Sequence, residues 1–251
     1  MKVIFHERFY DVYAREPAAA PGRMEAIVSA LGQEMPFINA EPATEEDIAL
    51  VHTNDHIARI KNSPDLYEIS LLAVGAAIKA SVLAMQGEPA FALLRPPGHH
   101  ASPNSCWGFC YFNNIAIAIK KLFHKGLIKR ALLLDIDLHF GDGTANSFSG
   151  FPEVDYFHPE SSERKDFLAK IEKHLQKSSA IDILAVSAGF DRHQEDWGGL
   201  LTTDDYRTIG NLVKTYAQKF CHGRRFGVLE GGYNHQVLGQ NVRAFLEGLK
   251  D

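Results

Sequence analysis

Residues 131–143, ALLLDIDLHFGDG, join a short apolar run to a cluster of acids and one histidine. The apolar part, residues 131–136, is typical of a strand that is covered on both faces. Side chains at positions i, i+2 and i+4 of an extended strand point to the same face, so Asp135, Asp137 and His139 are expected to converge. A carboxylate and an imidazole at that point could bind one divalent ion.

Comparable apolar runs alternate with segments of helical periodicity along the chain. This alternation predicts an α/β fold with a parallel sheet, formed by one domain over residues 1–251. Residues 16–21 and 146–163 are interpreted as loops. The other predicted strands span residues 2–5, 90–94, 181–187 and 226–229. Helices are predicted over residues 23–33, 44–51, 66–85, 113–122, 162–175, 203–221 and 237–249.

The composition is that of an ordinary soluble chain. With 251 residues, 45% of them hydrophobic, it is long enough to bury a large core. A net charge of -5, without a long Lys/Arg block, argues against a nucleic-acid partner. We see no apolar stretch near the ~20 residues that span a bilayer, and no signal peptide, so a cytoplasmic location without membrane contact is predicted. The three cysteines lack paired spacing and are expected to be free thiols. The oligomeric state is left open.

Polar motifs follow four of the predicted strands directly. His99 and His100 come after residues 90–94, and the acidic stretch comes after residues 131–134. Gly-Phe-Asp at 189–191 and Glu-Gly-Gly-Tyr at 230–233 follow two further strands. Open α/β sheets bind ligands at the carboxyl ends of their strands, so the sequence predicts one shared site there.

The sequence contains five motifs in this order: RPPGHHA at 95–101, GFCYFNNIAIA at 108–118, DIDLHFGDGT at 135–144, SAGFD at 187–191 and EGGY at 230–233. Together they resemble the zinc-dependent histone deacetylase and acetylpolyamine amidohydrolase superfamily. The arginine-proline start and the glutamate before the two glycines are more similar to its class II and bacterial branch. The resemblance implies a three-layer arginase/deacetylase fold, with a central parallel sheet of about eight strands.

The resemblance implies that Asp137, His139 and Asp191 bind one Zn²⁺. Three protein ligands with one open position is the usual catalytic zinc pattern, although iron(II) or cobalt would fit the same ligands. The alternative for Asp191 is a loop-capping aspartate. Gly141 and His193 stand where a second metal ion would need carboxylates, as in the distantly similar arginases, so one ion is favoured over a pair.

The histidine pair would move protons. By resemblance, His100 is the general base, and His99 orients the water and steadies the developing charge. An imidazole suits this because its unperturbed pKa of ~6.5 lies near working pH. Asp135 and Asp142 match carboxylates that bind the far nitrogens of His99 and His100, respectively. The alternative is a pair of structural histidines.

Three more residues match family positions for substrate. Tyr233 would donate a hydrogen bond to the developing oxyanion. Gly108 would accept the hydrogen of the substrate amide through its carbonyl, and Phe109 would line the acyl-lysine tunnel. The alternative for Tyr233 and Phe109 is a place in the core.

The chain departs from the family pattern by being loop-trimmed. Residues 60–73 lack the acids and tyrosines of the family's long rim loop, and residues 157–160 lack its second tunnel aromatic. We therefore expect a shallow, open pocket rather than a deep tube. The serine of the family's monovalent-cation site is replaced near Tyr156, so a structural K⁺ near Asp135 is left open.

These residues together predict a zinc-dependent amidohydrolase. It would remove an acyl group, most simply acetyl, from an amine such as acetyl-lysine or an acetylpolyamine. Two alternatives remain: another hydrolase of the same fold, either an arginase-like ureohydrolase or an acetoin-utilisation type protein, and a catalytically silent binding module. Two metal ions per chain would indicate the ureohydrolase, and a blocked pocket would indicate the silent module.

Overall fold

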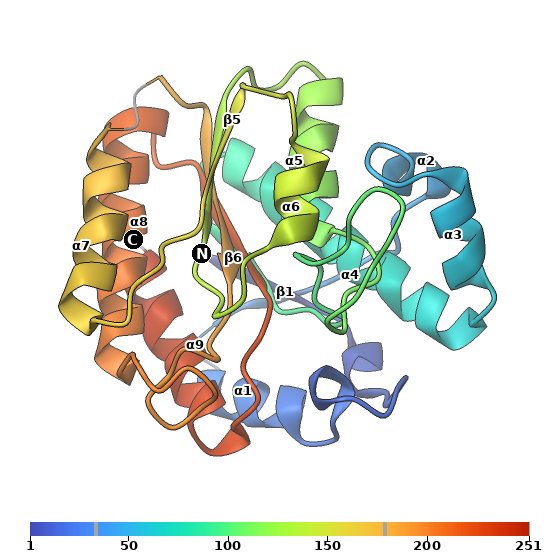
Figure 1. The fold of residues 1–251 in the computed structure, drawn as a ribbon, viewed down its shortest axis with the longest axis horizontal. Helices are drawn as coiled ribbons and strands as arrows, with labels where there is room; N and C mark the ends of the chain where they lie inside the picture. Colours follow the sequence, from blue (N-terminus) through green and yellow to red (C-terminus); the bar gives the residue numbers. More distant parts are fainter. Residues whose placement is uncertain (33–34, 178–179, 251) are drawn as a thin grey trace.

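One parallel sheet forms the centre of the computed structural model, which describes residues 1–32, 35–177 and 180–250 (Figure 1). Seven strands of the described residues lie in the order β2-β1-β3-β7-β6-β4-β5, and every neighbouring pair is parallel. This confirms the predicted α/β class, with seven strands where about eight were implied. The strands are β1 (Lys2–Phe5), β2 (Phe37–Asn39), β3 (Ala90–Ala92), β4 (Ala131–Asp135), β5 (Val154–Phe157), β6 (Ile183–Ala188) and β7 (Arg225–Leu229).

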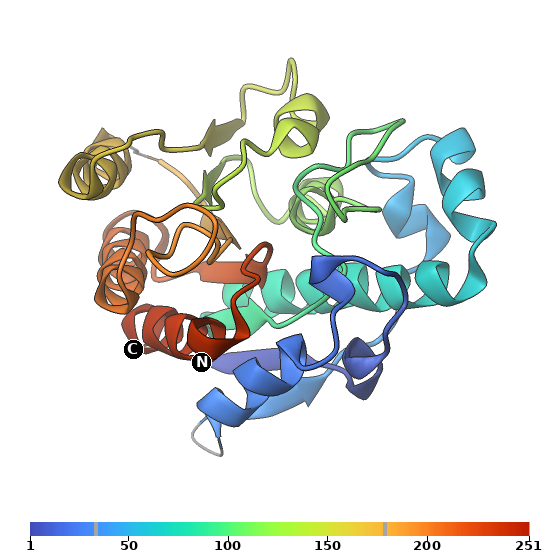
Figure 2. The same cartoon turned by 60° about the horizontal axis from the view of Figure 1, so that its bottom comes forward.

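Helices cover both faces of the sheet and make the fold three-layered. In Figures 1 and 2, α1, α7, α8 and α9 lie on one side of the sheet, and α4 and α5 lie on the other. The α-helices of the described residues are α1 (Arg23–Leu31), α2 (Glu45–Ile48), α3 (Asn54–Lys61), α4 (Pro64–Met85), α5 (Asn114–His124), α6 (Asp142–Ser147), α7 (Arg164–Lys177), α8 (Thr203–Cys221) and α9 (His235–Leu249).

Local sequence explains where the helices beside the site begin. The Asn113 side chain accepts a hydrogen bond from the backbone of Ala116 and so caps α5. Thr202 and Asp205 form a capping box at the start of α8. The central strands β4, β6 and β7 are buried along their whole length, as their continuous apolar runs predict.

Helix α4 corrects one sequence expectation. At 22 residues it is long and apolar enough to cross a membrane by length and composition, although we expected no such stretch. More than half of its apolar window (56%) is buried inside the fold, where the helix packs against β1, β3, β7 and α5. Burial of this kind is what a core helix requires, because an all-round apolar surface must be covered.

Most predicted elements are present, and the errors fall on short ones. The five predicted strands, which start at residues 2, 90, 131, 181 and 226 in the prediction, are present with ends shifted by at most two residues. The seven predicted helices are also present, although the helix predicted over residues 44–51 is shorter than expected. The last residue predicted for α1, Gln33, lies outside the described residues. The two predicted loops were wrong in part, because residues 17–19 form a short 3-10 helix and residues 154–157 form β5. Strand β2 and helices α3 and α6 were missed.

Candidate active site

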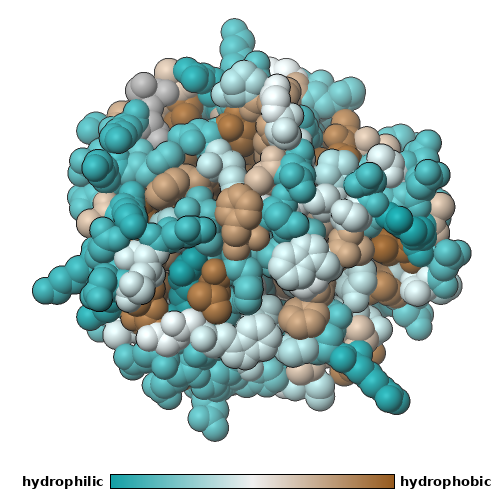
Figure 3. All heavy atoms as spheres, in the orientation of Figure 1, coloured by the Kyte–Doolittle hydropathy of each residue, from teal (hydrophilic) through white to brown (hydrophobic). Residues whose placement is uncertain are grey.

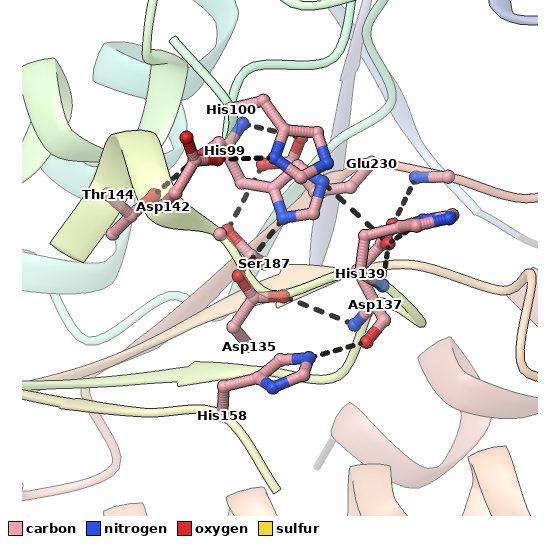
Figure 4. A network of polar contacts seen from close by, with 12 residues as sticks. His99, His100, Asp135, Asp137, His139, Asp142, Thr144, His158, Ser187 and Glu230 are labelled. Carbon is pink, nitrogen blue, oxygen red and sulfur yellow. Dashed lines mark hydrogen bonds and ion pairs between the residues drawn. The ribbon is translucent and has the colours of Figure 1, made fainter. Parts of the chain in front are cut away.

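The site lies at the carboxyl ends of four adjacent strands. Strands β3, β7, β6 and β4 are neighbours, and their carboxyl ends lead into the four polar motifs. Because all four strands are parallel, these loops meet at one edge of the sheet. Most of the side chains labelled in Figure 4 come from the ends of these strands, from the loops after them and from α6, whereas His158 follows β5.

Asp137, His139 and Asp191 form a compact group of potential metal ligands. His139 Nδ1 lies 3.2 Å from Asp137 Oδ1 and 3.2 Å from Asp191 Oδ2. Both aspartates are buried, whereas the His139 side chain is 39% exposed. Asp191 Oδ2 is a buried oxygen that accepts no hydrogen bond. An acceptor left in this state is costly unless a cation completes it.

This group fits a divalent cation in both spacing and charge. Two donor atoms that each lie about 2.0–2.2 Å from a tetrahedral zinc are roughly 3.3–3.5 Å apart, close to the separations observed. The carboxylates of Asp137 and Asp191 beside its ring raise the pKa of His139 to about 10. Burial and the charge of Asp137 raise the pKa of Asp191 to about 7. The group therefore binds positive charge strongly, and Zn²⁺ suits its oxygen and nitrogen donors.

The expected ladder was wrong in one respect. Strand β4 ends at Asp135, and residues 137–139 form a bend, so Asp135 does not share a strand face with Asp137 and His139. The bend is held because Arg192 Nε and His158 Nε2 lie 3.0 Å and 2.9 Å from the carbonyl oxygen of Asp137. The Asp135 side chain consequently lies against His99 and is not part of the ligand group of Asp137, His139 and Asp191.

Backbone amides hold the two ligand carboxylates. Gly231 donates to Asp137 Oδ2 at 2.8 Å, and Leu138 donates to Asp191 Oδ1 at 2.9 Å. The first contact requires a glycine, because a Cβ at position 231 would lie 2.5 Å from Asp137 Oδ2 and 2.8 Å from Asp191 Oδ2. This close approach explains why the motif after β7 contains glycine.

Each histidine of the pair has its own aspartate. His99 Nδ1 lies 3.1 Å from Asp135 Oδ2, and His100 Nδ1 lies 2.7 Å from Asp142 Oδ1 (Figure 4). The two rings are tilted, with centroids 4.1 Å apart. The predicted pairing of histidines and aspartates is thus the one in the structure. Such partners fix the tautomer and the orientation of an imidazole.

The two histidines differ in protonation. Burial alone would lower the pKa of His99, but the charges of Asp137 and Asp135 outweigh it and raise that pKa well above the usual range. Burial, with the neighbouring His99, lowers the pKa of His100 to about 4. At neutral pH His100 is therefore uncharged and can accept a proton, whereas Asp137 and Asp135 favour the protonated form of His99.

Glu230 holds the backbone that carries the histidine pair, and the sequence analysis gave it no role. Its Oε2 accepts from the backbone amides of Gly98 (2.7 Å) and His99 (3.2 Å), and its Oε1 accepts from Ser187 Oγ (3.1 Å). The side chain is fully buried, which raises the pKa of Glu230 to about 7. Glu230 also lies with His99 and Cys110 in a second buried group of possible ligands, but its oxygens already have these donors.

His193 does not join the metal group. Its Nδ1 accepts from the backbone amide of Glu195, and its ring stacks with Tyr206. Among the residues that the structure describes, the ligand group around His139 contains only Asp137 and Asp191 besides His139 itself. The number of ions per chain stays a prediction.

A small pocket of about 130 Å³ opens beside the metal group and the histidine pair. Gly108 has a positive φ of 58°, and a Cβ there would lie 2.5 Å from His100 Cδ2, so only glycine lets this loop approach the histidine. The next residue, Phe109, packs edge-on against Tyr233, with ring centroids 5.9 Å apart. Burial raises the pKa of Tyr233 far above its usual value, so its phenol keeps the proton. The lining residues are His100, Trp107, Gly108, Phe109, His139, Trp197 and Tyr233.

Two tryptophans form walls that sequence reasoning missed. Trp107 lies over the His100 ring with centroids 3.9 Å apart, and Trp197 stacks on Tyr233 at 4.1 Å. They are 56% and 54% exposed, which is unusual for rings of this size. Trp107 directly precedes Gly108, and this adjacency was the one available signal. Figure 3 shows brown and pale side chains gathered near the middle of the face that Figure 1 views. The expected pocket depth stays a prediction, but its walls are more aromatic than expected.

Comparison with known proteins agrees with this geometry. The family described as "Histone deacetylase domain" matches residues 18–159 and 154–249. The chain belongs to the histone deacetylase family. A "Probable deacetylase" of Archaeoglobus fulgidus is 30% identical over 92% of this chain and 81% of its own length. "Histone deacetylase 8" of Arabidopsis thaliana is 27% identical over 96% of this chain and 80% of its own length.

A solved structure confirms the histone deacetylase fold. The structure titled "Crystal Structure of HDA15 HD domain" superposes with a TM-score of 0.85, covering 99% of this chain and 88% of the other, at 24% identity. Membership of the family indicates a hydrolase of the deacetylase class. It also accounts for the five motifs meeting at one edge of the sheet.

Proposed function

We propose that this protein is a zinc-dependent deacetylase that hydrolyses the amide of an acetylated amine, with acetyl-lysine and acetylated polyamines as its substrate classes. The observation that carries the proposal is the convergence of three elements on one pocket. These are the group of Asp137, His139 and Asp191, the two histidine–aspartate pairs, and the phenol of Tyr233.

Asp137, His139 and Asp191 would hold the zinc. A zinc ion in such a site supplies Lewis-acid polarisation of the amide carbonyl and a lowered pKa for water. The neutral His100 lines the pocket and takes up the proton that the attacking water loses. Asp142 holds the other ring nitrogen of His100, so the nitrogen that faces the pocket is the free one.

The remaining residues stabilise charge and position the substrate. His99, held by Asp135 at 3.1 Å, would balance negative charge as the carbonyl is attacked. Tyr233 retains its proton and donates a hydrogen bond to the oxyanion. The histidine pair then returns a proton to the leaving amine. Trp107 and Trp197 give the pocket apolar walls that suit the alkyl chain between the amide and the rest of the substrate.

The test is acetate release by the zinc-loaded protein from acetyl-lysine peptides and acetylated polyamines, with longer acyl-lysines in the same panel. Tyr233→Phe is the matched variant, because it removes one hydroxyl and keeps the ring that packs against Phe109 and Trp197. We expect kcat to fall by about 10²–10³-fold with zinc content unchanged, as for the loss of one oxyanion donor. Absence of turnover on the whole panel with one zinc bound, or full activity of the variant, would contradict the proposal.

A further inference from the structure

Trp107 makes a specific contact with the carboxylate that holds His100. Its indole Nε1 donates to both oxygens of Asp142, at 3.1 Å to Oδ1 and 2.9 Å to Oδ2. Its ring also lies over His100, with centroids 3.9 Å apart and planes tilted by 34°. One side chain therefore touches both members of the His100–Asp142 pair.

The other pair, His99–Asp135, is the inner of the two and shows what such a contact does. Asp135 is fully buried, and besides His99 it accepts from Tyr156 Oη at 2.9 Å and from the Asp137 amide at 3.1 Å. Burial and these two donors fix the plane of the Asp135 carboxylate. The inner histidine therefore has a partner that cannot rotate.

The outer pair, His100–Asp142, is less buried and its carboxylate has fewer donors. The Asp142 side chain is 38% exposed, and it belongs to α6, a helix of only six residues. Within the described part of the chain, the hydrogen bonds to its carboxylate come from His100 and Trp107. Without the indole, Oδ2 would face solvent, and the carboxylate could rotate about its terminal bond. A catalytic imidazole must be held within about 0.5 Å and 10–20° of its working geometry.

We propose that Trp107 is a positioning residue that fixes the Asp142 carboxylate, and through it the ring of His100, in the orientation that the reaction needs. It corresponds in action to Tyr156 on the inner pair, but it acts from the pocket wall. This inference rests on the proposed function, since it assigns His100 the task of proton transfer. It goes further by giving the indole N–H a task that the apolar face of the ring cannot perform.

A Trp107→Phe substitution separates the two contributions. Phenylalanine keeps an aromatic ring against His100 and removes the donor to Asp142. We expect kcat to fall about tenfold, the lower end of the effect of removing a supporting hydrogen bond, with KM changed less than about twofold. In an Asp142→Ala background the same substitution should cost almost nothing further, because its target is gone.

Trp197→Phe is the matched control. Trp197 is equally exposed and stacks on Tyr233 across the pocket, but among the hydrogen bonds of the described residues its indole nitrogen has no acceptor. Its effects on kcat and KM should therefore combine additively with those of Asp142→Ala. Additivity for Trp107→Phe as well, or a rise in KM alone, would show that Trp107 is only a wall and would overturn the proposal.

A second readout does not depend on turnover. The Nδ1 proton of His100, bonded to Asp142 at 2.7 Å, should give a low-field NMR resonance that Asp142→Ala abolishes. We expect faster solvent exchange of this proton in Trp107→Phe and unchanged exchange in Trp197→Phe. If no substrate is hydrolysed, the proposed function fails while this measurement still decides the contact. Equal exchange in wild type and Trp107→Phe would refute it.

Discussion

A methyl group at position 231 should weaken metal binding without disturbing the rest of the fold. Gly231 donates its amide to Asp137 Oδ2 and passes directly beside both ligand carboxylates. In Gly231→Ala the new Cβ would lie 2.5 Å from Asp137 Oδ2 and 2.8 Å from Asp191 Oδ2. Ordinary contact begins near 3.4 Å, so the two oxygens must move by about 0.9 Å and about 0.6 Å.

Both displacements exceed the roughly 0.5 Å within which a metal site keeps its geometry. We expect zinc affinity to fall about 100-fold, which corresponds to about 2.7 kcal/mol. Because a bound ligand stabilises the folded state in proportion to the logarithm of its affinity, the rise in Tm on adding zinc should shrink by roughly 5–10 °C.

The assay is competition for zinc against a chelator, with thermal unfolding followed in the presence and absence of the ion. Gly150→Ala is the control, because Gly150 has a φ of +73° and a Cβ added there would meet no atom within 4 Å. It should lower stability by about 1–2 kcal/mol through backbone strain and leave zinc affinity unchanged. Wild-type zinc affinity in a folded Gly231→Ala protein would refute the assignment of Asp137 and Asp191 as ligands.

Two further predictions concern the surroundings of the site. Tyr156→Phe removes the hydroxyl that donates to Asp135 and accepts from the Gly141 amide. We expect the free energy of unfolding to fall by about 1–3 kcal/mol and kcat to fall about tenfold, with zinc content retained. An unchanged kcat would contradict this. Burial lowers the pKa of His52 to about 3, below its unfolded value near 6.5, so its contribution to stability is complete above about pH 6.5 and is lost as pH falls toward 3. Unfolding at pH 7.5 and pH 5 should show about 2 kcal/mol less pH dependence in His52→Gln than in wild type, and equal pH dependence would contradict the argument.

The sheet could be predicted where apolar runs were long enough to carry a pattern. Strands β4, β6 and β7 are wholly buried, and their sequences show it. Strand β2 has three residues, none of them buried, and β5 has one buried residue of four, so neither has the pattern of a core strand. Both are edge strands whose pairing with a neighbour, rather than their own sequence, makes them strands.

The site could be predicted from its motifs but not from geometry. The structure brings the ten predicted site residues to one edge of the sheet, yet the reasoning that put Asp135 on one strand face with His139 was wrong, because the strand ends there. Tyr156 and Trp197 were missed as supporting residues because each comes from a loop or strand separated in sequence from the side chain it contacts. Contacts of this kind depend on the tertiary fold and leave no local pattern.

The position of the two tryptophans makes the fluorescence of this protein a signal from the pocket. The chain has two tryptophans, Trp107 and Trp197, and both line the pocket. Its entire indole fluorescence therefore originates beside His100 and Tyr233, with none from the core. We expect a ligand that enters the pocket to change the emission, so that binding can be titrated without a label. For the same reason, a fluorescence-detected unfolding curve follows the opening of the pocket, and circular dichroism is needed to follow the sheet.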